Sequence, residues 1–174
     1  AETFNLNDVV AAALDSPAMH LLRDGRPEIM VNYRPDSSPI VVRGFPSMLR
    51  SSLVGLFSAT LRASAKGGRL DIATASEEFK EPWGHFVRGK SGWYGVVRVL
   101  TSIRLGPEEI DSLFEPYAAP RLTAGAGLAF PLVLLSMRAH RGLTLARDSA
   151  SPPGLDIRLL IPLAAAEPAA PAPA

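Results

Sequence analysis

The sequence contains no cysteine, and this absence excludes disulfide bonds and thiolate metal sites. Only three histidines are present, His20, His85 and His140, and their scattered positions do not suggest a common set of metal ligands. We therefore expect no bound metal. Lysine and arginine together number 18, against 17 aspartates and glutamates. This balance gives no electrostatic reason to expect nucleic acid or an acidic membrane as a partner.

Long apolar runs are also missing from the chain. No segment approaches the length of a transmembrane helix, and the opening residues, AETFN, do not resemble a signal peptide. We therefore expect a cytoplasmic segment that makes no membrane contact.

The composition of the 174 residues, 47% hydrophobic and 20% charged, suits a globular domain with a substantial core. Residues 164–174 are mostly alanine and proline and include no core-forming side chain. We expect one domain over residues 1–163 and a disordered tail over residues 164–174.

Hydrophobic periodicity predicts the secondary structure. The strongest helix spans 47–65, carries a wide apolar stripe and ends at Gly67-Gly68. Asn5 and Ser16 are suited to cap two earlier helices. We predict the other helices at 4–14, 18–23, 107–113 and 128–140, and strands at 27–34, 39–43, 69–76, 93–101, 143–149 and 155–163. Residues 118–124 form a loop in this prediction, and residues 77–91 form either a loop or an excursion of a hairpin. This order predicts an α/β two-layer sandwich, with one mixed β-sheet and helices on one face.

A glycine-rich turn, Gly125-Ala126-Gly127, leads directly into the helix predicted at 128–140. The free N–H groups and the dipole at a helix N-terminus can bind phosphate. Such a turn is also common in loops that bind nothing, so these residues alone leave both interpretations open.

Four blocks of sequence, in this order, resemble the ATPase domain of sensor histidine kinases, which has the GHKL or Bergerat fold. The lead-in is FNLNDVVAAAL, and the N box with its following strand is GFPSMLRSSLVGLFSATLRASAKGGRLDIATA. The G1 and F boxes correspond to VVRVLTSIRLGPEEIDSLFEPY, and the G2 box with its helix to GAGLAFPLVLLSMRAHRG. The resemblance covers about residues 4–163 and implies a bacterial two-component signalling protein.

The family's ATP-binding residues are mostly replaced in this chain. The resemblance places Ala59 where the family has a magnesium-binding asparagine, Gly55 where a second asparagine is often seen, and Leu100 where an aspartate binds adenine. Residues 44–66 contain no asparagine and residues 92–106 no carboxylate, so a shifted alignment restores neither. Two G1 glycines become Ser102 and Arg104 and the third G2 glycine becomes Ala129, while Gly125, Gly127 and Leu128 remain as a partial ATP lid.

These replacements predict a degenerate domain that binds neither ATP nor magnesium. We expect Leu100, with Ile103 and Leu105, to fill space between the helix at 47–65 and the sheet. The F box, Phe114 to Tyr117, is intact and is followed by a short loop with one charge, Arg121. We expect Phe114, Tyr117 and Arg121 to line a partner-contact surface.

Three functions follow from the resemblance. The first is a non-catalytic interaction module, the C-terminal part of a larger sensor or adaptor, which docks on a helical hairpin and on a response-regulator receiver domain. The second is a divergent histidine kinase that still uses ATP and magnesium. The third is the C-terminal domain of a histidine phosphotransferase. An aromatic and basic cluster around Trp83 and Trp93 is either a partner surface or the cover of a sheet edge.

Overall fold

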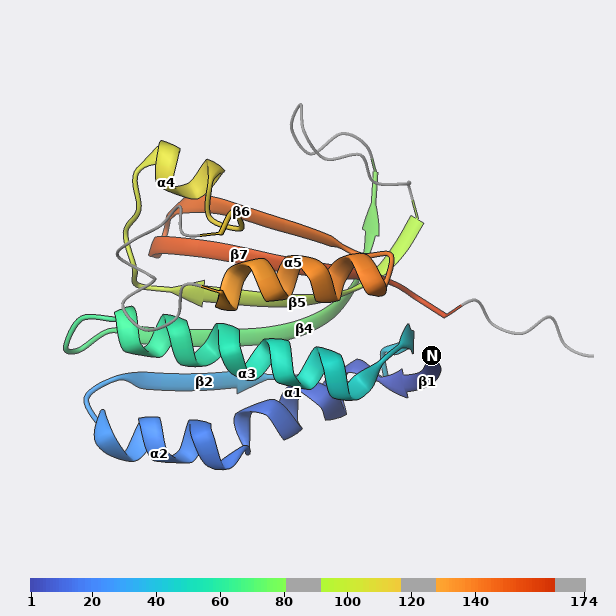
Figure 1. Ribbon diagram of the computed structural model, residues 1–174, viewed down its shortest axis with the longest axis horizontal. Helices are drawn as coiled ribbons and strands as arrows, with labels where there is room; N and C mark the ends of the chain where they lie inside the picture. The colour runs from blue at the N-terminus through green and yellow to red at the C-terminus, as the bar shows by residue number, and fades with distance from the viewer. Residues whose placement is uncertain (81–91, 117–127, 165–174) are drawn as a thin grey trace, which may run out of the picture.

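The computed structural model describes residues 1–80, 92–116 and 128–164 and has two layers (Figure 1). A five-stranded sheet in the order β2-β4-β5-β7-β6 carries helices on one face, and a separate pair joins β1 to β3. Only β2 and β4 run parallel within the large sheet, so the predicted mixed α/β sandwich is confirmed. The helices are α1 (Leu6–Leu14), α2 (Pro17–Gly25), α3 (Pro46–Ala63), α4 (Pro107–Asp111) and α5 (Ala129–Ala139), and the strands are β1 (Glu2–Asn5), β2 (Met30–Arg34), β3 (Val41–Gly44), β4 (Arg69–Phe79), β5 (Gly92–Thr101), β6 (Leu143–Ala150) and β7 (Pro153–Pro162).

The observed elements follow the predicted order, with two corrections. Residues 2–5 pair with β3 as a short strand, so the first helix begins at Leu6 and not at residue 4. Asn5 caps this helix as predicted, because its side chain accepts a hydrogen bond from the Asn7 N–H at 3.1 Å. Strand β4 continues to Phe79 and pairs there with Gly92 of β5, so the start of the segment predicted at 77–91 belongs to a hairpin and not to a loop. The part of that segment from 81 to 91, the loop at 118–124 and the tail from 165 lie outside the described residues.

The main core lies between α3 and the sheet. Strand β7 turns alternate residues toward the helices, where Leu155, Ile157, Leu159 and Ile161 are all buried. Leu49, Leu53, Leu56 and Phe57 meet them from α3. In Figure 1, α5 lies beside α3 along the sheet, and α1 lies on the other side of α3.

The C-terminal end of α3 is held by an arginine from the turn before β2. The guanidinium of Arg26 donates hydrogen bonds to the carbonyls of Leu61, Arg62 and Ser64, at 3.1, 2.9 and 2.8 Å. The last carbonyls of a helix have no partner within the helix. Arg26 therefore satisfies three of these acceptors and links the α2–β2 turn to the longest helix.

The opposite face of the sheet contains an ionic cluster around Asp156 of β7, which is 1% exposed. Arg98 of β5 donates to both of its carboxylate oxygens, at 3.2 and 3.0 Å, and Arg147 and Arg158 approach Oδ2 at 3.3 and 3.5 Å. Burial raises the pKa of Asp156, but the hydrogen bond from Arg98 and the charges of Arg158, Arg98 and Arg147 outweigh it, so the pKa lies below its usual value. Arg98 stands directly opposite Arg158 in the sheet, and the carboxylate between them offsets their repulsion.

We predict that Arg26→Lys lowers the free energy of unfolding by about 1–3 kcal/mol, because a lysine keeps the charge but cannot reach three carbonyls at once. Urea denaturation measures this difference. Arg62→Lys is the matched control, because Arg62 is exposed on the last turn of α3 and its side chain has no hydrogen bond among the described residues. An equal loss in both variants would contradict the role of Arg26.

We predict that Asp156→Asn destabilises the domain at pH 7 by about 2–3 kcal/mol, because the arginines lose a buried anionic acceptor. The folded pKa lies below the unfolded value of about 3.9, so this stabilisation is complete above that value and is lost as pH falls through the folded pKa. The stability curves of parent and variant should therefore converge below about pH 4. Asp111→Asn, at an exposed position, controls for loss of a carboxylate; a pH-independent gap between parent and Asp156→Asn would contradict the prediction.

Candidate functional site

The positions expected to correspond to the ATP site come from α3, from the end of β5 and its following loop, and from the residue before α5. The structure describes Gly55, Ala59, Leu100, Ser102, Arg104 and Leu128. Gly125 and Gly127, the glycines of the expected lid, lie outside the described residues, as do Tyr117 and Arg121 of the expected partner surface. Their predicted roles stay predictions.

The residues of α3 at and beside the expected ATP-site positions make contacts within the protein. Ala59 is 2% exposed and belongs to the main core. Gly55 faces α5, where an added Cβ would lie 3.9 Å from that of Ala129. Thr60 is fully buried, and its hydroxyl donates to carbonyls of its own helix. Ser58 donates to the sulfur of Met19 at 3.6 Å. The methyl of Ala59 offers no oxygen ligand of the kind that magnesium requires.

Leu100 does not occupy the predicted place. It stands opposite Asp71 on one side and Asp156 on the other, so it lies on the sheet face away from α3. The next residue, Thr101, stands opposite the core residues Leu70 and Leu155 and is fully buried on the side of the helices. The expectation that Leu100 fills space beneath the long helix is therefore wrong, because a shift of one residue along a strand exchanges its two faces.

The loop after β5 is tied to the start of β4. The Ser102 hydroxyl accepts a hydrogen bond from the Arg69 N–H at 3.1 Å, and the Ser102 N–H donates to the Arg69 carbonyl at 3.3 Å. Ile103 and Leu105 pack against the main core, as predicted. Arg104 extends toward β6 and lies 3.8 Å from a carboxylate oxygen of Asp148. No residue of this loop has a positive φ, so its backbone does not require glycine.

Phe114 belongs to the packed interior as well as to the expected partner surface. Its ring meets that of Phe130 edge to face, with centroids 6.0 Å apart, and it packs against the main core. The ring is only partly buried. The contact joins the segment after α4 to α5, and the proposed role of Phe114 in partner binding remains a prediction.

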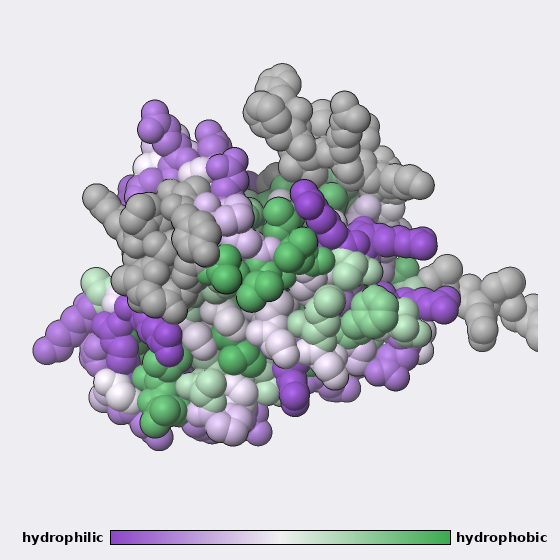
Figure 2. Space-filling view, in the orientation of Figure 1, coloured by the Kyte–Doolittle hydropathy of each residue, from purple (hydrophilic) through white to green (hydrophobic). Residues whose placement is uncertain are grey.

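An apolar stripe on α5 was missed by the sequence analysis. Leu128, Leu132 and Leu135 are 49%, 52% and 55% exposed, and their spacing of four and three residues places them along one side of the helix. Phe45 and Met48, at the start of α3, are also exposed. Figure 2 shows the hydrophobic side chains gathered on this face of the molecule. The spacing of the leucines was the available signal, but Phe130, Val133 and Met137 on the buried side concealed it.

His140 joins the end of α5 to the start of α3. It is the C-cap residue of α5 and is almost fully buried. Its Nδ1 lies 2.7 Å from the Ser136 carbonyl, which can only accept, and its Nε2 accepts from the Phe45 N–H at 2.9 Å. These partners define a neutral imidazole protonated at Nδ1. A Cβ on Gly44 would lie within 2.0 Å of the ring, so glycine is required there.

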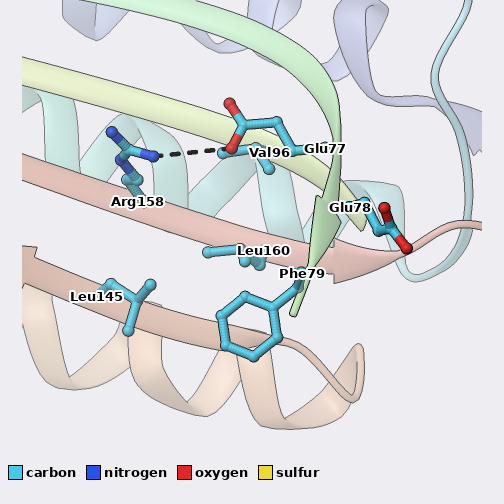
Figure 3. A pocket seen from close by; sticks show the side chains of 7 residues that line it. All are labelled: Glu77, Glu78, Phe79, Val96, Leu145, Arg158 and Leu160. Carbon is cyan, nitrogen blue, oxygen red and sulfur yellow. Dashed lines mark ion pairs between the residues drawn. The ribbon is translucent and has the colours of Figure 1, made fainter. Parts of the chain in front are cut away.

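A small pocket opens on the sheet face away from the helices (Figure 3). Its volume is about 50 Å³, and Phe79, Val96, Leu145 and Leu160 form its apolar lining. Glu77 pairs with Arg158 across it at 3.7 Å. The pocket is too small for a nucleotide. The part of the chain that the structure describes contains no cluster of potential metal ligands and no helix long and apolar enough to cross a membrane.

Comparison with known proteins identifies the fold through solved structures. No family model and no curated protein matches this chain. The mycobacterial sensor histidine kinase MprB is 20% identical, with 93% of this chain and 97% of that chain covered and a TM-score of 0.68. The catalytic domain of histidine kinase ThkA is 18% identical, with coverages of 92% and 94% and a TM-score of 0.69. ThkA in complex with the response regulator protein TrrA is 16% identical, with coverages of 93% and 41% and a TM-score of 0.65.

These similarities extend over nearly the whole chain, and the strand order and helix layer agree with the family expected from the four sequence blocks. Identities of this size establish a shared architecture and leave the chemistry of the site to be argued from its residues. The chain has the fold of the histidine kinase ATPase domain, the GHKL or Bergerat fold.

Proposed function

We propose that this chain is a non-catalytic member of the histidine-kinase ATPase fold, which acts as an interaction module in a two-component phosphorelay. The observation that carries the proposal is the burial of Ala59, the residue that the sequence resemblance aligns with the family's magnesium-binding asparagine. At the end of β5 the side chain that faces the helices is the hydroxyl of Thr101, and no carboxylate is available in residues 92–106. The module would be the cytoplasmic C-terminal part of a larger sensor or adaptor.

The apolar stripe of α5 supports a docking role. The three half-exposed leucines lie along one helix, and Phe45 and Met48 are exposed at the start of α3. Together these residues give more apolar surface than scattered single residues would. Apolar side chains at this spacing form a ridge that can pack into a groove on the surface of a second helix. We assign this stripe to the helical hairpin of the same signalling protein. The complex of ThkA with TrrA supports a receiver domain as the second partner. We propose, from the sequence resemblance alone, that Phe114, Tyr117 and Arg121 belong to the surface that contacts it.

We predict that Mg·ATP does not stabilise the domain. A ligand at about 100 times its dissociation constant stabilises the folded state by about 2.7 kcal/mol, which a thermal melt detects. Melts with ATP, with and without magnesium, and calorimetric titration should all show no binding. A magnesium-dependent rise in Tm would contradict the proposal and favour a divergent, active histidine kinase.

We predict that Leu132→Ser together with Leu135→Ser weakens binding to the helical hairpin at least about tenfold, because apolar anchors contribute most of the affinity at such surfaces. Calorimetry against the isolated hairpin measures the change, and the melting temperature should be nearly unchanged because both leucines are half exposed. Leu21→Ser on α2, another exposed leucine, is the matched control. Unchanged binding by the double variant would place the docking surface elsewhere, and Tyr117→Ala and Arg121→Ala then test the receiver-contact region separately.

A further inference from the structure

A cavity of about 520 Å³ lies where the β3–α3 junction, the end of α5 and the end of β7 meet. Arg43 and Arg141 line it, together with apolar wall residues that include Phe45, Pro162 and Leu163. We call it the basic cavity. Its volume falls in the range of about 300–1,000 Å³ typical of small-molecule sites, and its lining combines apolar walls with a few charged groups, as such sites do.

The two arginines of the basic cavity are not neutralised. The side chains of Arg43 and Arg141 make no ion pair or hydrogen bond with any residue that the structure describes. No aspartate or glutamate is among the residues lining the cavity. His140 also borders it, but both of its ring nitrogens are already engaged within the protein. The arginines therefore supply the side-chain charge available to a ligand there, and Ala1 also lines the cavity.

The backbone of Arg141 has a conformation that is unfavourable for residues other than glycine. Its φ is +54°, in the left-handed region, where it follows α5 in the position that glycine usually takes. The Arg141 N–H donates to the Arg138 carbonyl at 3.0 Å, and the Gly142 N–H to the Met137 carbonyl at 2.7 Å. Glycine is required at 142, where a Cβ would lie 2.3 Å from the Leu160 carbonyl oxygen. The left-handed conformation of Arg141 costs free energy for a residue other than glycine, and such a conformation points to a role for the side chain.

We propose that the basic cavity binds a small organic anion, in which a carboxylate or phosphate group meets Arg43 and Arg141 and an apolar body meets Phe45, Pro162 and Leu163. A guanidinium matches the oxygens of either anion in a bidentate geometry. The residues that line the cavity come from segments far apart in the sequence. A ligand there would contact the start of α3, the end of α5 and the end of β7. This site does not depend on nucleotide binding, and it shares only Phe45 with the apolar surface proposed for docking.

The test is titration of the ¹⁵N-labelled protein at constant ionic strength with phenyl phosphate, benzoate and inorganic phosphate. The amide signals of Gly44, Phe45 and Gly142 should move with phenyl phosphate or benzoate, and inorganic phosphate should bind at least about tenfold more weakly because it lacks the apolar body. Comparison of phenyl phosphate with benzoate identifies which anionic group the site prefers. Absence of signal changes up to millimolar ligand would overturn the proposal, and equal binding of inorganic phosphate would overturn the apolar part of it.

Arg141→Gly is the decisive variant, because it removes a guanidinium and places the preferred residue in the left-handed conformation. It should keep or raise the melting temperature and weaken binding of the preferred probe at least about tenfold. Arg43→Gln should weaken binding similarly. Arg138→Gln is the charge-matched control, because Arg138 is exposed on the last turn of α5 and does not line the cavity. Equal binding by the parent and Arg141→Gly, or equal weakening by Arg138→Gln, would overturn the assignment.

Discussion

The regular alternation of β5, paired with β4 on one side and β7 on the other, is the constraint on which the rest of the structure depends. It sends Val97 and Val99 into the core beneath the helices and Arg98 to the opposite face, where it meets Asp156. A slip of one residue would bury Arg98 in the apolar core without its partner. One register therefore produces both the packed face and the ionic face of the sheet.

Helix α3 transmits this arrangement to the helical layer, because it contacts α1, α2 and α5 as well as forming the core. Both of its ends are held by side chains distant in sequence. Arg26 binds its last carbonyls, and His140 accepts the N–H of Phe45 just before its first turn. The helix on which the family carries a metal ligand is thus anchored here by protein contacts, and its Ala59 adds to the core.

The molecule has the fold of the histidine kinase ATPase domain. The positions that the sequence resemblance aligns with the ATP site contribute packing, through Ala59, or hydrogen bonds within the fold, through Ser102. Two exposed surfaces have a different chemistry. The leucines of α5 are apolar, and the basic cavity is cationic. These are the surfaces that we propose for a helical partner and for a small anion, since fold and site chemistry can change independently.

The sequence by itself determined the features that depend on residues close together in the chain. Periodicity located the helices and the strands of the large sheet but not β1, and Asn5 and Ser16 cap the helices they were expected to cap. The sequence did not predict the position of Leu100 correctly, because alignment to a motif does not reveal which face of a paired strand a residue occupies. Only the tertiary structure decided the cluster at Asp156, the contact of His140 with Phe45 and the basic cavity. Each joins segments tens of residues apart, and side chains so separated meet only after the sheet has paired and the helices have packed on it.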